Sequence, residues 1–240
     1  MNTQNETIEL LLANRTHLYG IFHAVFGSAP GEELLDLLSA PATPRAFALL
    51  SEKDGDAMAE ISRFVRKQKE KYLSDPEYLS HVKAEYTKLM IGPGPLIAYP
   101  WESAYSGKEK QLFQESTLRV REAYRKYGYL PAHYPRVADD HIALELHFMA
   151  KLSETAFEAF QKGDAGNTVR ILKDQRAFIR RHMLSWLPEY ARDLGSSQTA
   201  YFYPQFGQAV SEFVRIDDEA ASEIIDTLPV YRINPHSVCP

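Results

Sequence analysis

The sequence predicts an all-α fold, a single compact domain of roughly nine or ten helices over residues 1–228, followed by an irregular tail at residues 229–240. Apolar residues recur at steps of three and four through most of the chain, which is typical of helices with one buried face. Convincing strand-like alternation is absent, and glycines and prolines stand where one periodic segment gives way to the next. Hydrophobic residues make up 45% of the 240, which is enough to fill one core.

The first half of the chain predicts four helical segments. The first carries an apolar stripe from Ile8 to Phe26 that only Arg15 interrupts. Asp75 and Pro76 place a capping acid before a proline that suits a first helical turn. The segments cover residues 8–26, a short stretch at 34–38, about 54–72 and 76–90, and Pro41 and Pro44 predict a break after the second.

The second half of the chain predicts a further set of helices. Gly128 and Gly163 each follow a periodic segment, as a residue that ends a helix often does. Pro204 falls in the first turn of the last long segment, where a proline is tolerated. The predicted segments are 113–127, 144–160, 169–186 with an end at Pro188, and 201–213, and apolar residues at 224, 225 and 228 close the ordered part.

The segment Gly92–Trp101 breaks the helical pattern. It contains three prolines, which fix φ and make the segment stiff and mostly extended. It is also apolar, although loops normally face water. We therefore expect this loop either to pack beneath another element or to receive an apolar ligand; its apolar members are Leu96, Ile97, Ala98, Tyr99 and Trp101.

Composition excludes several classes of protein. The chain has 32 acidic and 27 basic residues, a net charge of -5, which argues against a nucleic-acid binder and permits a cationic peptide partner. Its one cysteine, Cys239, makes neither an internal disulfide nor a cysteine metal cluster, in keeping with a reducing compartment. No apolar run reaches about 18 residues, so we expect no membrane insertion. Residues 1–8 lack the features of a secretory signal.

Three clusters hold the side chains with chemical potential. The first surrounds the apolar loop, the second lies at the start of a predicted helix, and the third ends another helix. In order they are Glu85-Tyr86, Leu89, Gly92-Pro93-Gly94, Pro100-Trp101-Glu102-Ser103 and Tyr105; Asp139-Asp140-His141 with Glu145; and His182 with Trp186-Leu187-Pro188.

In this order the clusters resemble the motifs of the TorD/DmsD family of redox-enzyme maturation chaperones. The resemblance covers roughly residues 72–186. It implies an all-helical cytoplasmic protein, not an enzyme, that binds the twin-arginine leader and apo-form of a molybdopterin-dependent reductase precursor. Such a chaperone proofreads Tat export by holding the precursor until its cofactor is inserted. The matching residues Trp101, Asp140 and His141 would belong to the leader-binding region, while Tyr99 and Ala138 depart from the family pattern.

The residues themselves suit such a ligand. A twin-arginine leader presents two guanidinium groups and then an apolar segment, so its receptor needs carboxylates and an apolar groove. Four acids supply the charge, and the aromatic and aliphatic side chains of the loop line the groove. The predicted leader-binding residues are Leu96, Tyr99, Pro100, Trp101, Glu102, Tyr105, Asp139, Asp140, His141 and Glu145, with Ile97 as a further lining residue.

Structural roles compete with this interpretation. Asp139 or Asp140 before a helix is often only an N-cap, and the pattern favours that role for one of the two. His182 and Trp186 fit simple packing better than binding.

Two functional alternatives remain. His141 and Glu145 lie four residues apart on one helix face, so with Asp140 or Asp139 they would form part of a metal-dependent active site. We expect no metal or cofactor, because none of the histidines at 17, 23, 133 and 147 forms a recognisable ligand pair. The other alternative is a NarJ-like assembly chaperone that acts on a cofactor-bearing subunit without reading a leader.

Overall fold

A computed structural model describes residues 3–92, 94–106, 115–130, 137–198 and 200–228, so the predicted tail at 229–240 lies outside the described residues. Within the described part the secondary structure is helical, which confirms the predicted all-α class. The elements are α1 (Thr3–Gly27), α2 (Glu32–Ser39), α3 (Ala42–Ala48), α4 (Ala57–Arg66), α5 (Gln68–Ser74), α6 (Tyr78–Tyr86), η1 (Thr87–Ile91), η2 (Glu102–Ala104), α7 (Glu115–Lys126), α8 (Ile142–Gln161), α9 (Ala165–Phe178), η3 (Ile179–Met183), α10 (Leu187–Gly195) and α11 (Tyr203–Thr227).

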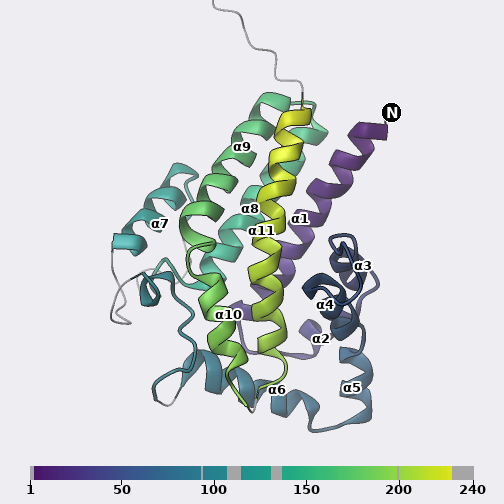
Figure 1. Cartoon of the computed structure of the whole chain (residues 1–240), viewed down its shortest axis with the longest axis vertical. Coiled ribbons are helices and arrows are strands. Elements are labelled where there is room, and N and C mark those ends of the chain that lie inside the picture. The colour runs from purple at the N-terminus through teal and green to yellow at the C-terminus, as the bar shows by residue number, and fades with distance from the viewer. Residues whose placement is uncertain (1–2, 93, 107–114, 131–136, 199, 229–240) are drawn as a thin grey trace, which may run out of the picture.

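Long helices form the body of the molecule. In Figure 1, α1, α8, α9 and α11 run side by side, while the short helices α2 to α5 gather beside the lower half of α1. Helix α1 packs most extensively against α8, and α11 packs against α10, α9 and α4. None of the helices in the described ranges is long and apolar enough to cross a membrane.

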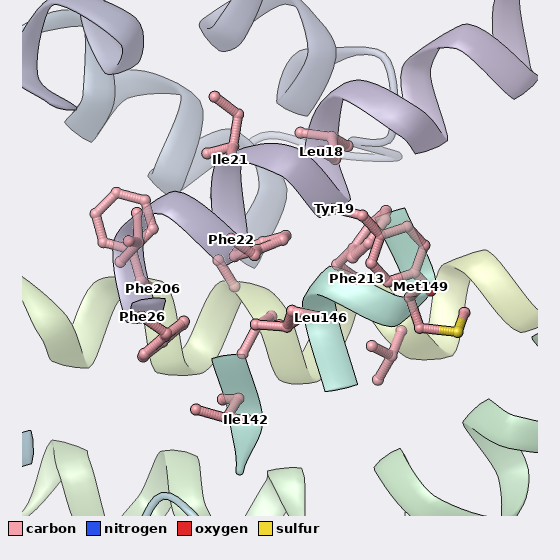
Figure 2. Packing of buried hydrophobic residues seen from close by; sticks show 14 of the residues in the cluster. Leu18, Tyr19, Ile21, Phe22, Phe26, Ile142, Leu146, Met149, Phe206 and Phe213 are labelled. Carbon is pink, nitrogen blue, oxygen red and sulfur yellow. The ribbon is translucent and has the colours of Figure 1, made fainter. Parts of the chain in front are cut away.

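The core lies between α1, α8 and α11. Figure 2 shows side chains of α1 meeting those of the other two helices, and each is at most 1% exposed. The Tyr19 and Phe213 rings meet edge-on with centroids 4.8 Å apart. The labelled residues are Leu18, Tyr19, Ile21, Phe22 and Phe26 of α1, Ile142, Leu146 and Met149 of α8, and Phe206 and Phe213 of α11.

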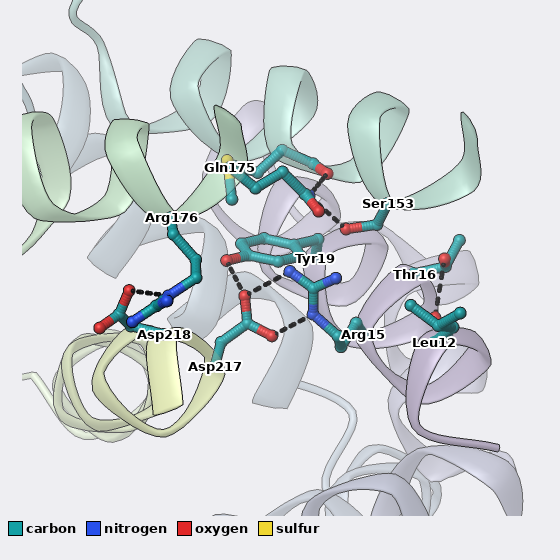
Figure 3. Close-up of polar contacts among 10 residues, drawn as sticks. Leu12, Arg15, Thr16, Tyr19, Ser153, Gln175, Arg176, Asp217 and Asp218 are labelled. Carbon is teal, nitrogen blue, oxygen red and sulfur yellow. Dashed lines mark hydrogen bonds and ion pairs between the residues drawn. The ribbon is translucent and has the colours of Figure 1, made fainter. Parts of the chain in front are cut away.

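A buried ion pair explains the charged residue in the apolar stripe of α1. The Arg15 guanidinium donates to both carboxylate oxygens of Asp217 on α11, at 2.5 and 3.0 Å, and the Tyr19 hydroxyl donates to the same carboxylate at 2.7 Å (Figure 3). Such a planar fork-to-fork pair is directional as well as strong. It therefore fixes how α1 and α11 lie against one another.

Several of the predicted helix boundaries were wrong. The expected single helix at about 54–72 is two helices, α4 and α5. The expected break at Pro41 and Pro44 is helix α3, because Pro41 is its N-cap and Pro44 lies in its first turn, where a backbone N–H has no partner to lose. The expected single helix at 169–186 is α9 followed by the π-helical turn η3. Pro188, expected to end it, instead lies in the first turn of α10.

Glu85 connects the end of α6 to the start of α11. Its buried carboxylate accepts the backbone N–H groups of Tyr201, Phe202 and Tyr203 at 2.7 to 3.3 Å. Helix α11 has no cap of its own, so this distant acid takes the place of an N-capping side chain. The first motif of the sequence thus has a structural role at this residue.

Candidate functional site

The proline-rich loop and the start of α8 lie side by side, as predicted. Trp101 and His141 form an isolated antiparallel β-bridge. The Glu102 N–H donates to the Asp140 carbonyl at 3.0 Å, and the Ile142 N–H donates to the Pro100 carbonyl at 2.9 Å. Two segments far apart in sequence are therefore joined by backbone hydrogen bonds.

The two aromatic side chains of this bridge remain partly accessible. The rings of Trp101 and His141 meet edge-on, with centroids 5.1 Å apart, and both residues are half-buried. His141 Nδ1 accepts the Ala143 N–H at 3.1 Å, so His141 is the N-cap of α8 and carries its proton on Nε2. Burial lowers the pKa of His141 to about 4, against the opposing charge of Asp140. The imidazole is therefore neutral at pH 7.

Asp139 and Asp140 face the interior of the molecule. Asp140 is fully buried and accepts the Ser103 N–H at 2.7 Å and the Thr117 hydroxyl at 3.0 Å. Asp139 accepts from Arg121 Nε of α7 at 2.7 Å. Both aspartates thus hold the loop and α7 against the start of α8, and in this conformation neither faces solvent.

The two glutamates lie behind the loop. Glu102 is buried, and its Oε2 lies 3.0 Å from Nδ1 of His182 on η3. Burial raises the pKa of Glu102, and the hydrogen bond to His182 opposes that rise. Glu145 is also fully buried, and neither of its carboxyl oxygens makes a hydrogen bond of normal geometry within the described residues.

Tyr105 joins the loop to α10. Its hydroxyl donates to Asp193 Oδ2 at 3.0 Å and accepts the Tyr99 N–H at 3.2 Å. Its ring stacks on that of Trp186, with centroids 5.7 Å apart and planes 28° apart. Burial raises the pKa of the Tyr105 hydroxyl, and the Asp193 charge adds to the rise. Tyr105 therefore stays un-ionised and holds the loop in place.

The predicted set divides into an accessible group and a buried group. The accessible residues form an aromatic and aliphatic surface at the protein–solvent boundary, whereas the buried ones form a hydrogen-bonded layer beneath it. Half-buried are Leu96, Tyr99, Trp101, Tyr105 and His141; buried are Pro100, Glu102, Asp139, Asp140 and Glu145. Ile97, the further lining residue, is 39% exposed.

Several residues of this layer carried no recognised signal in the sequence. Ser103 contributes its backbone N–H, which no side-chain pattern reveals. Thr117 and Arg121 lie on α7, outside the three clusters. His182 was expected only to pack, yet it is the partner of Glu102. The one available signal in the sequence was that His182 belongs to the third of the three clusters.

A cleft of about 270 Å³ lies beside this layer, between α7, α8 and α9. Phe148, Leu152 and Phe178 are among its apolar lining residues, and His182 lines it too, so the cleft reaches the partner of Glu102. Its charged lining residues are Arg119, Glu122, Lys126, Asp174 and Arg181. Across the described ranges, no three histidine, cysteine, aspartate or glutamate side chains group in a way that would hold a metal ion.

Comparison with known proteins adds a family to this geometry. A family profile described as nitrate reductase delta subunit matches residues 48–192. A selenate reductase assembly chaperone of Thauera selenatis is 32% identical over 151 residues, covering 60% of this chain and 73% of that protein. A probable Tat proofreading chaperone DmsD of Haemophilus influenzae is 26% identical, covering 51% and 53%. A chaperone protein TorD of Photobacterium profundum is 25% identical, covering 56% and 61%. The matched profile contains the whole loop-and-helix site.

Proposed function

The chain belongs to the family of TorD- and DmsD-type maturation chaperones whose profile is described as nitrate reductase delta subunit, and from this premise we propose that it binds the twin-arginine leader of a molybdopterin-dependent reductase precursor. In this proposal it also binds the apo-form of that enzyme, in the cytoplasm, and holds it until the cofactor is inserted. The protein itself acts as a chaperone and catalyses no reaction.

The observation that carries the proposal is the accessible aromatic surface on a rigid base. Trp101 and His141 are half-buried and so partly accessible, and their backbones are joined by the β-bridge. Large apolar side chains at a surface often mark a binding site. A surface fixed before binding loses little conformational entropy when a ligand arrives, which favours affinity.

We assign the two parts of the predicted set different tasks. The apolar segment of the leader packs on the half-buried residues of the loop, with Trp101 as the central contact. The buried acids and Pro100 position these residues, and those of the acids that carry charge behind the surface attract the arginine side chains. All ten predicted residues therefore belong to the proposed site, but only five of them are accessible before a ligand binds.

Tryptophan fluorescence offers a direct test. The chain contains two tryptophans, Trp101 and Trp186; Trp101 belongs to the accessible set, and Trp186 stacks on Tyr105. Titration with a synthetic leader peptide should therefore change the intrinsic emission. Peptides with lysine for the two arginines, or glycine for the leucines of the apolar segment, should bind more weakly. Equal binding of all three peptides would refute twin-arginine reading.

Trp101→Ala should weaken leader binding by about 2 kcal/mol or more, roughly thirtyfold in Kd, because buried tryptophans often dominate interface energies. Calorimetric titration measures this loss without relying on tryptophan emission. Leu118→Ala provides a matched control, since Leu118 is an apolar residue on α7 that is 54% exposed and outside the proposed site. A Trp101→Ala protein that is folded and binds like the parent would show that the site lies elsewhere.

The profile description favours one second candidate, a NarJ-like assembly chaperone that acts on the enzyme subunit without reading a leader. The two candidates differ in what they capture. Pull-down with an apo-reductase lacking its leader would succeed for the assembly chaperone and fail, or weaken strongly, for a protein that depends on the leader.

A further inference from the structure

Among the described residues, several buried polar side-chain atoms of the loop, α7, α8 and the start of α10 have no hydrogen-bond partner. Buried polar groups are nearly always hydrogen-bonded, so a local concentration of exceptions needs an explanation. Glu145 is 0% exposed and has two such oxygens, and Ser103 is 0% exposed and has one. The atoms concerned are Trp101 Nε1, Ser103 Oγ, Ser116 Oγ, both Glu145 carboxyl oxygens and Trp186 Nε1.

The same place holds three carboxyl groups and little positive charge. Glu102 and Asp140 both raise the electrostatic cost of ionising Glu145, so both lie close enough to Glu145 to interact with it. His182 contacts Glu102, whereas Asp140 is held by a backbone N–H and a hydroxyl, which are neutral. We call Glu102, Asp140 and Glu145 the acid cluster.

The other charged and titratable groups near the acid cluster that belong to the described residues have identified partners. Arg121 pairs with Asp139, and the Tyr124 hydroxyl donates to the Asp139 carbonyl. Arg119 of α7 exerts a weak field on Glu102 but pairs with Glu115. The neighbouring His141 uses Nδ1 to cap α8. The described neighbours thus leave Glu145 without a compensating cation.

Glu145 therefore keeps its proton at rest. Burial raises its pKa well above the ordinary value, the charges of Glu102 and Asp140 raise it further, and the nearby indole of Trp186 opposes the rise. Ionising a buried carboxyl without a partner is costly, and protonation is the usual escape.

We propose that the acid cluster is a receptor for one guanidinium group of the leader, and that this guanidinium replaces the proton carried by Glu145. This inference rests on the proposed leader-binding function. In the exchange, the Glu145 O–H bond breaks, the proton passes to the solvent, and the arginine cation pairs with the resulting carboxylate. No covalent bond forms between the protein and the leader. The net charge of the site is unchanged, because one proton leaves as one arginine cation enters.

Geometry favours arginine over lysine for this exchange. The planar guanidinium has five N–H donors in a fixed fork, whereas an ammonium group is a compact point charge. Two unpartnered oxygens of Glu145 with the Glu102 and Asp140 carboxyls nearby match several donors at once. The acid cluster is buried in this conformation, so entry of a guanidinium needs a transient opening of the loop, after which the two backbone hydrogen bonds and the contact from the Ser103 N–H to Asp140 form again.

The test measures how many protons are released when a leader peptide binds. The full chain is titrated calorimetrically with a synthetic leader that has two consecutive arginines, in buffers of different ionisation enthalpy. Up to about one proton should be released per bound peptide, and Kd should fall as pH rises, by at most roughly tenfold per pH unit, as long as Glu145 is protonated in the free protein. A peptide with glutamine at both arginine positions should release none.

Glu145→Gln provides the decisive variant because it cannot ionise. It should release no proton and show a flat pH dependence, while Glu158→Gln, an exposed site on the same helix, should behave like the parent. Binding by the parent without proton release, or unchanged release in Glu145→Gln, would overturn the exchange and leave leader binding intact. If Glu145→Gln does not fold, the parent's buffer dependence decides alone. If the folded parent binds no arginine peptide, leader binding fails, and the exchange with it.

Discussion

Glu145 and Arg15 are both charged-type side chains enclosed by the protein, and they are accommodated in opposite ways. Arg15 is paired with Asp217 and Tyr19 and keeps its charge. Glu145 has no such partner among the residues that the structure describes, and it is uncharged because it holds a proton. The difference separates a structural ion pair from a group that is prepared to receive a cation.

Glu145→Gln should stabilise the free protein at neutral and higher pH. The raised pKa means that folding keeps Glu145 protonated, while the unfolded chain loses this proton above its ordinary pKa of 4.5. The parent's free energy of unfolding therefore falls as pH rises from that value towards the folded pKa, by about 1.4 kcal/mol per pH unit. The Glu145→Gln side chain cannot ionise in either state, so this fall in the free energy of unfolding is absent from the variant.

Urea unfolding of the parent and Glu145→Gln at several pH values measures the effect. The two stabilities should converge below about pH 4.5, where Glu145 is largely protonated in both states, and diverge in favour of the variant above it. Glu158→Gln should follow the parent at each pH. A constant difference between the parent and Glu145→Gln across the range would contradict a buried proton.

At the scale of elements, the loop 92–101 shows what the sequence predicts well. Its prolines and apolar residues indicated a stiff segment that packs or binds, and the structure places it against the start of α8. Gly92 has φ +86°, a left-handed conformation that favours glycine, and it ends η1 at the predicted position. The residue types within this segment were therefore sufficient to predict these features.

Other features of the site depend on contacts that no local pattern reveals. Asp139 and Asp140 resemble helix caps, yet His141 is the cap and the aspartates bond to α7 and the loop. The direction in which each acid faces depends on which neighbours the tertiary fold brings near. For this reason the sequence predicted which segments meet, but it did not predict that the acids lie beneath the surface.

Glu85 links two elements in a manner that can be tested locally. Glu85→Ala leaves three backbone N–H groups at the start of α11 without their acceptor, and it should lower stability by about 2–3 kcal/mol. Hydrogen exchange at Tyr201, Phe202 and Tyr203 should rise first, because these amides lose their protection. Lys83→Ala, at an exposed position on α6, serves as the control. Unchanged exchange at the three amides would contradict the capping role.

At the scale of the whole molecule, the site is supported by helices that lie outside the matched family profile. The profile covers residues 48–192, whereas α1 and α11 lie at 3–27 and 203–227. Helix α1 nevertheless packs along α8, the start of which forms half of the site, and α11 packs against α10, which contacts Tyr105. The position of the site therefore depends on a frame that these two helices complete.

The Arg15–Asp217 pair should control the stability of this frame. Arg15→Met removes the cation and leaves the Asp217 carboxylate buried, which should cost about 3–5 kcal/mol of unfolding free energy. Arg15→Met with Asp217→Leu removes both charges and should recover most of that loss, because apolar side chains of similar volume often replace a buried pair without cost. Urea unfolding followed by circular dichroism measures all three proteins.

Arg63→Met supplies the matched control, since Arg63 pairs with Asp54 and Glu60 at the surface, where solvent screens the interaction. Its unfolding midpoint should stay close to that of the parent. If Arg15→Met were as mild as Arg63→Met, the buried pair would not hold α1 to α11. If the double variant were no better than Arg15→Met, the loss would come from lost packing around the Arg15 stem and not from the stranded charge of Asp217.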